Sequence, residues 1–172
     1  TVSVSGLSTT TYITLETTHY DYKISYAATS NTTDTLTIQP TYINAYSTAS
    51  VKMPDKYAIE SVSVASEAGV NAAFDQTDAT TLKISSATAD STVTVRLYQY
   101  DWKVQFKDKE NNILDTQYVL NGVTAAYDDF KPGTWIKSIL NGITNAVISN
   151  PKTSTERASV KVEKVTSDTI VT

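Results

Sequence analysis

Three aromatic residues are the side chains in this chain best suited to recognise a ligand. Tyr98, Tyr100 and Trp102 occupy alternate positions, and alternate residues of a strand share one face of a sheet. Rings on one face could form a flat platform on which a sugar stacks. Core packing between two domains explains the same stripe more economically, because aromatic side chains are usually well buried. The pattern therefore favours interdomain packing, with a glycan-binding platform as the functional hypothesis.

Lys23 is a candidate for a covalent cross-link. It lies in a strand-like run in which Tyr22 and Ile24 alternate with polar residues. In surface domains of Gram-positive bacteria, a buried lysine and an asparagine can form an intramolecular isopeptide bond beside an acidic residue. The sequence does not identify the partner of Lys23. An intact mass lower than the sequence mass by one ammonia would reveal the bond.

The sequence carries no pattern typical of catalysis or of cofactor binding. The chain has one histidine, His19, and no cysteine, so neither a histidine pair nor a thiolate can hold a metal within one chain. A Ser-His-Asp triad would depend on His19, whose place in a strand-like stretch favours a surface or packing role. Glycine-rich phosphate loops are missing. Paired carboxylates could cleave a glycosidic bond, but most acidic residues fall in turn clusters, so we expect a non-enzymatic protein without metal or cofactor.

The composition is typical of a β-rich, outward-facing protein. Threonine, serine and tyrosine are abundant, and threonine and tyrosine suit a pleated, half-solvated surface. The formal net charge of -4 argues against nucleic acid as a partner, since nucleic acid is bound by basic surfaces. No apolar run approaches the roughly 20 residues that cross a bilayer. The absence of cysteine weakens the case for a small secreted eukaryotic domain and leaves bacterial surface proteins and virus particles open.

The first half of the chain, residues 1–99, is predicted to be one domain of short strands. Strand-like runs between polar turns are expected at residues 20–26, 35–39, 57–65, 81–85 and 91–98. This spacing predicts an antiparallel, immunoglobulin-like β-sandwich, whereas a parallel sheet would require crossover helices. The alternating residues 1–8 could form an edge strand or a strand donated to a neighbouring molecule.

The second half, residues 100–172, is predicted to begin with a hairpin. Val104 and Phe106 share a face with Trp102, and residues 108–112 (DKENN) turn the chain into a returning strand at residues 113–120. Asn111 and Asn112 are the residues of this turn that best tolerate left-handed backbone angles.

A short helix is predicted at residues 133–140. Pro132 suits the first turn of a helix, the apolar residues that follow recur on one face, and Asn141 with Gly142 supplies a stop. Strands at residues 143–149 and 158–165 would complete the domain.

The hairpin resembles a known extracellular repeat. Seven residues match the pattern F-x-D-x-D-G-x-x-L-x-x-Q-x-V-x-x-G of the Listeria-Bacteroides, or internalin B-type, repeat without an insertion: Phe106, Asp108, Glu110, Leu114, Gln117, Val119 and Gly122. Asn111 replaces the turn glycine of the family. The G-Y-x-F-x-G-W ending of the family is not clearly present, although Gly133 and Trp135 could be remnants of it.

This resemblance implies a small β-grasp-like (ββαββ) module. Such modules occur in tandem on bacterial cell surfaces as stalks, spacers or adhesion units, with other protein modules or subunits as partners. A phage particle is the alternative setting, as a head fibre, decoration or tail protein, because phages display similar β-modules. A carbohydrate-binding module, with a glycan as partner, is a third hypothesis that depends on the aromatic platform.

Overall fold

The computed structural model describes residues 5–6, 18–66 and 69–172 of the 172-residue chain. Every regular element in these ranges is a β-strand, and the strands form four small sheets. The predicted mainly β class is confirmed. No helix within the described ranges is long and apolar enough to cross a membrane. The predicted edge or donated strand at residues 1–8 lies outside the described residues except for residues 5 and 6.

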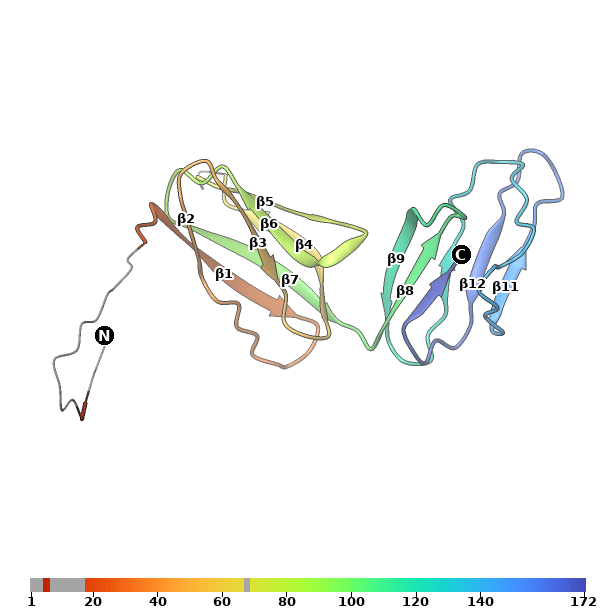
Figure 1. Cartoon of the computed structure of the whole chain (residues 1–172), viewed down its shortest axis with the longest axis horizontal. Helices are drawn as coiled ribbons and strands as arrows, with labels where there is room; N and C mark the ends of the chain where they lie inside the picture. Colours follow the sequence, from red (N-terminus) through yellow and green to blue (C-terminus); the bar gives the residue numbers. More distant parts are fainter. Residues whose placement is uncertain (1–4, 7–17, 67–68) are drawn as a thin grey trace.

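Two sheets are formed before residue 100 (Figure 1). One sheet has the order β2-β1-β7-β4, with β1 at Tyr22–Ser30, β2 at Thr41–Ile43, β4 at Tyr57–Val64 and β7 at Ser91–Gln99. The other has the order β3-β6-β5, with β3 at Thr48–Lys52, β5 at Asn71–Asp75 and β6 at Asp78–Ser85. The strands expected at residues 57–65, 81–85 and 91–98 are confirmed, and that at residues 20–26 is confirmed in part.

A single core lies between these two sheets. Alternate residues of β7, including Val95 and Leu97, point inward and meet Leu82 and Ile84 of β6, and all four are fully buried. Burying one such side chain contributes about 1.5–3 kcal/mol. Residues 35–39 form no strand, so that prediction was wrong. Ile38 nevertheless packs into this core, so the apolar pattern there reflects burial without strand pairing.

The strand order does not support the predicted antiparallel, immunoglobulin-like sandwich. In the immunoglobulin order the last two strands pair within one sheet. Here β7 lies between β4 and β1 and runs parallel to β1, with Ile24 opposite Ser91. The connection needs no helix, because the chain between β1 and β7 passes through five other strands. Alternation determines which residues face the core but leaves the pairing of distant strands open.

Two further sheets are formed after residue 100. One has the order β13-β8-β9, with β8 at Trp102–Lys107, β9 at Ile113–Val119 and β13 at Thr169–Val171. The other has the order β10-β12-β11, with β10 at Ala125–Tyr127, β11 at Ala146–Ser149 and β12 at Ser159–Val162. The predicted hairpin is confirmed as β8 and β9, and Asn111 in its turn has a φ of 67°. As in the first half, the first and last described strands, β8 and β13, pair in parallel.

The second core is smaller and centres on Phe106. Val104 and Phe106 of β8 are buried against Val162 of β12 and Val171 of β13. The ring of Phe106 stacks on that of Tyr127, with the centroids 5.9 Å apart. The inward stripe predicted from the spacing of β8 is therefore the face that holds the two sheets together.

The helix predicted at residues 133–140 is absent from the described residues, so the ββαββ arrangement is not supported. The backbone groups of this segment bond elsewhere: the N–H of Ile136 donates to Asn150 Oδ1 at 2.8 Å, and its carbonyl accepts from Asn150 Nδ2 at 3.0 Å. The N–H of Leu140 donates to the carbonyl of Thr172 at 2.8 Å. A helix needs these groups for bonds four residues apart. Contacts remote in the sequence therefore override the helical pattern.

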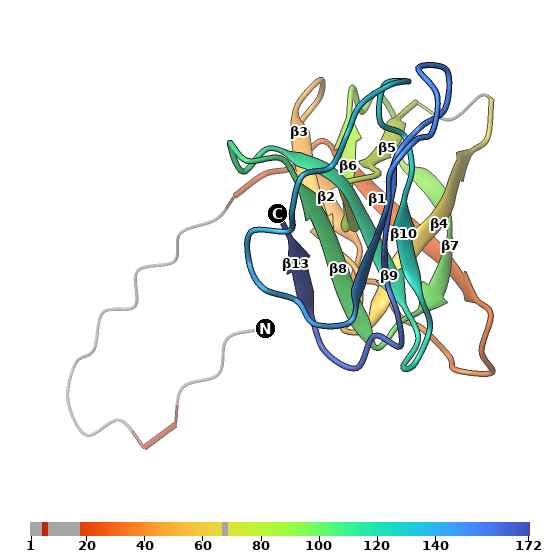
Figure 2. The ribbon, with the colours of Figure 1, turned by 90° about the vertical axis from the view of Figure 1, so that its right-hand side faces the viewer.

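The two halves lie end to end (Figure 1), and the view along their common axis shows β8 to β10 and β13 in front of the first half (Figure 2). No sheet in the described ranges contains strands from both sides of residue 100. A small cluster lies where the halves meet. Ala58 and Ala79 of the first half and Tyr118 of the second are buried in it, against Tyr98 and Tyr100.

Candidate functional site

A polar cleft of about 520 Å³ lies at the junction of the two halves. Tyr100 lines it together with residues of both halves. Its lysines and aspartates are equal in number, so their formal charges cancel: Lys52, Lys56, Lys103, Asp55, Asp78 and Asp168. Such a lining offers donors and acceptors of hydrogen bonds without a net charge. The lining therefore carries no net formal charge that would favour an ion of either sign.

The two residues that join the halves, Tyr100 and Asp101, are held from both sides. The N–H of Tyr100 donates to the carbonyl of Lys56 at 2.9 Å, and the N–H of Asp101 donates to the carbonyl of Val119 at 3.0 Å. The carbonyl of Asp101 accepts from Lys56 Nζ at 2.7 Å, and its Oδ2 accepts from the N–H of Asn121 at 2.8 Å. These bonds restrain the connection in one conformation.

The Lys56 side chain of the first half contacts the ring of Tyr100 in the connection and that of Trp102 in the second half. Its backbone has a φ of 62°, and its Nζ lies 5.6 Å from the ring centroid of Tyr100 and 5.1 Å from that of Trp102. Cations over such rings contribute about 0.5–1 kcal/mol at exposed sites. No pattern in the sequence indicates this role, because Lys56 is remote from the aromatic run.

The predicted aromatic platform is divided between two clusters. Tyr98 and Tyr100 pack with Tyr118, whose ring centroid lies 4.8 Å from that of Tyr100, whereas Trp102 packs against the second core. The three rings were expected on one continuous strand, but β7 ends at Gln99 and β8 begins at Trp102. The alternation of side chains between the two faces of a strand is therefore interrupted between Tyr98 and Trp102. All three rings are half-buried, and of the three Tyr100 alone lines the cleft. Their role in binding stays a prediction.

Lys23 lies on β1 with an exposed side chain, opposite Tyr42 of β2. Its N–H donates to Asp90 Oδ1 at 2.8 Å. An isopeptide donor of the kind described above is buried, so this exposure weighs against the cross-link. Intact mass remains its test.

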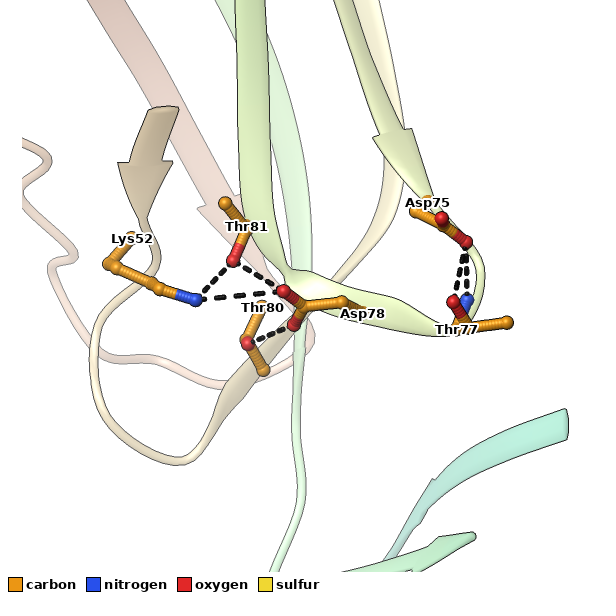
Figure 3. Close-up of polar contacts among 6 residues, drawn as sticks. All are labelled: Lys52, Asp75, Thr77, Asp78, Thr80 and Thr81. Atoms are coloured by element: carbon orange, nitrogen blue, oxygen red, sulfur yellow. Dashed lines mark hydrogen bonds and ion pairs between the residues drawn. The ribbon is translucent and has the colours of Figure 1, made fainter. Parts of the chain in front are cut away.

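The side chains around Asp78 form a hydrogen-bonded network (Figure 3), of which Lys52, Asp78 and Thr80 line the cleft. Asp78 Oδ1 accepts from the hydroxyl of Thr80 at 2.6 Å, and its Oδ2 accepts from that of Thr81 at 2.7 Å. Lys52 Nζ lies 3.6 Å from the same Oδ2 and also donates to Thr81. Burial opposes the ionisation of Asp78, but the two hydroxyls and Lys52 outweigh it and hold its pKa below the usual range. In the sequence, this network could have been inferred from the run D-A-T-T at residues 78–81, where two threonines closely follow the aspartate.

The neighbouring turn between β5 and β6 is organised by Asp75 (Figure 3). Its Oδ1 accepts from the N–H and from the hydroxyl of Thr77, both at 2.8 Å. These two hydrogen bonds hold the pKa of Asp75 below its usual range, and the bond from the backbone of Thr77 has the larger effect. Both aspartates therefore serve as charged acceptors rather than as proton donors, and of the two only Asp78 lines the cleft.

Tyr118 gives the junction a predicted alkaline sensitivity. Burial, and next the charge of Asp78, raise the pKa of Tyr118 to about 12. Because this value exceeds that of about 10 in an unfolded chain, the folded state gains stability that is fully present below about pH 10 and is lost as the pH rises through about 12. Urea unfolding across this range should show this loss, and Tyr118→Phe should make it smaller. Tyr42→Phe, at an exposed ring, should leave it unchanged; equal slopes for all three proteins would contradict the prediction.

The chain matches no protein-family model, no curated protein and no solved structure. Within the described ranges, no three His, Cys, Asp or Glu side chains are grouped to hold a metal ion.

Proposed function

We propose that this chain is a non-enzymatic, extracellular structural or adhesion module of a bacterial surface protein. The observation that carries the proposal is the junction, where Tyr100 and Asp101 are bonded to both halves. A stalk or spacer must hold its units at a fixed distance, and this connection restrains two β-units in series. The units proposed are residues 1–99 and 100–172.

The roles of the residues behind the hairpin resemblance also support this proposal. Asp108 Oδ1 accepts from the backbone N–H groups of Glu110 and Asn112, each at 2.9 Å, and its Oδ2 accepts from the Asn112 amide at 2.8 Å. The Asn112 side chain is the main reason that the pKa of Asp108 lies below its usual range. Phe106 fills the core, and Gln117 bonds the backbone of Ala126. These side chains maintain the architecture, as expected of a module that bears no active site.

The restraint at the junction can be measured with spin labels. The chain has no cysteine, so Ser63→Cys and Lys161→Cys, both at exposed positions, place one label in each half. We expect a narrow distribution of distances that broadens when Lys56→Ala and Asp101→Ala are combined, because the Lys56 side chain bonds the connection to the first half and the Asp101 side chain bonds it to the second. Lys109→Ala is the control. A distribution of unchanged width would contradict a clamped junction.

The setting is tested by locating the protein. Antibodies against the chain should label the surface of intact bacterial cells if the proposal is correct. Label on purified phage particles would support the alternative, a head fibre, decoration or tail protein. Hydrolysis of a glycan that is lost on changing one carboxylate would contradict the non-enzymatic role.

Carbohydrate binding is a second candidate function, favoured by the balanced charges and the Tyr100 ring of the junction cleft. A glycan array should then show binding of neutral oligosaccharides. Asp55→Ala should weaken this binding by about 10-fold, which corresponds to about 1.4 kcal/mol. Asp128→Ala, at an exposed carboxylate outside the cleft, should not. An array without bound glycans would remove this candidate.

A further inference from the structure

An apolar groove of about 520 Å³ lies on the second half and shares no lining residue with the junction cleft. The β8–β9 hairpin contributes Leu114, and β13 contributes Val171. The segment at residues 133–140, which forms no helix or strand, contributes Trp135, Ile136 and Leu140. Most of the side chains that line it are apolar. The groove is therefore apolar where the cleft is polar, and the two suit different ligands.

Large apolar side chains in this groove face solvent. Trp135 is 70% exposed, Leu140 66% and Leu114 37%. Contiguous apolar surface of this kind marks interaction sites, and tryptophan is among the residues that contribute most to interfaces. The segment is also held in place, because Asn150 bonds both backbone groups of Ile136. A surface fixed before binding loses less entropy when a partner docks.

The charges that line the groove indicate the sign of its partner. Lys107, Lys109 and Lys137 line it with one acidic side chain, Asp108, although the whole chain has a formal net charge of -4. Both oxygens of Asp108 already accept hydrogen bonds within its own turn. Lys109 lies 3.4 Å from Glu110 in an exposed pair, which contributes little. The local excess of positive charge favours an acidic partner.

We propose that this groove binds a segment of another protein in which aspartate or glutamate residues flank large apolar side chains. The apolar side chains of the segment cover Trp135, Leu140 and Leu114, and its carboxylates pair with the three lysines. This site is separate from the junction, and the inference does not depend on the function proposed above.

Selection of a random peptide library displayed on phage against the intact chain tests the proposal. Enriched peptides should combine aromatic or aliphatic residues with aspartate or glutamate. A synthetic peptide of the enriched sequence should bind Trp135→Ala at least about 10-fold more weakly. The combined change Lys107→Gln and Lys137→Gln should weaken its binding and reduce the dependence on salt.

Matched controls separate loss of the groove from loss of folding. Val147→Ala changes an exposed apolar residue of β11, and Lys131→Gln changes an exposed lysine, both outside the groove. Neither should alter peptide binding. Circular dichroism and thermal melting should show that Trp135→Ala folds like the unchanged chain, because the Trp135 side chain is largely exposed.

Three results would overturn the proposal. The first is no enrichment, or enrichment of basic or uncharged peptides. The second is equal binding of the enriched peptide by the unchanged chain and Trp135→Ala. The third is a dimer, detected by light scattering, that is lost in Trp135→Ala, because the groove would then be occupied by a second copy of this chain.

Discussion

Replacing Phe106 with alanine is expected to lower the free energy of unfolding of the second half by about 3–5 kcal/mol. Phe106 is 1% exposed and is the largest fully buried side chain. Its loss leaves a cavity between the two sheets and removes the stack with Tyr127. Both tryptophans, Trp102 and Trp135, lie after residue 100, so their fluorescence during urea unfolding reports mainly on this half.

The same experiment tests whether residues 1–99 and 100–172 fold independently. Circular dichroism follows the strands of both halves, so an early transition for the second half alone would show two units. Leu120→Ala, at a side chain that is 49% exposed, is the control and should change the free energy of unfolding by less than about 0.5 kcal/mol. Equal effects of the two substitutions would contradict the role assigned to Phe106.

Replacing Gln117 with leucine is expected to cost about 2–4 kcal/mol of stability. Gln117 Oε1 accepts from the N–H of Ala126 at 3.0 Å, and its Nε2 donates to the carbonyl of Ala126 and to Asp115 Oδ2 at 2.8 Å. Leucine has a similar size but leaves both backbone groups of Ala126 without these partners, and an unsatisfied group costs about 1–3 kcal/mol. Urea unfolding monitored by fluorescence gives the difference.

A second variant at this position shows whether the hydrogen bonds or the volume matter. Gln117→Glu keeps an acceptor for the N–H of Ala126, but an ionised carboxylate cannot donate to the carbonyl. A protonated carboxyl can do both, so its pKa in the folded state should lie above the usual value of about 4.3. The deficit relative to the unchanged chain should therefore shrink as the pH falls below about 5. A deficit independent of pH would contradict this account.

Local patterns in the sequence predicted the hairpin well. The alternation in β8 and β9 and the left-handed turn residue Asn111 all lie within residues 102–119, so no remote contact was needed to find them. The helix expected at residues 133–140 failed for the opposite reason. Asn150 and Thr172 bond its backbone from other segments, and periodicity carries no information about such competitors.

The junction cleft was equally difficult to predict. Of its lining residues, only Tyr100 was predicted from the sequence to contact a ligand. Lys56 reaches it from a turn and Asp78 from the start of β6, whereas Asp168 reaches it from near β13. Their proximity depends on how the two halves meet, which no local motif encodes. The parallel pairing of β1 with β7 was missed for the same reason.

That pairing has a mechanical consequence. In each half the first and last described strands lie side by side and run in the same direction, β1 with β7 and β8 with β13. When the chain is pulled from both sides, the force acts on the first residue of one strand and on the last residue of the other. In a parallel pair these two residues lie at opposite ends. The force then acts along the strands, so the hydrogen bonds between them share the load and do not open one after another. Tension on either half is therefore resisted in shear.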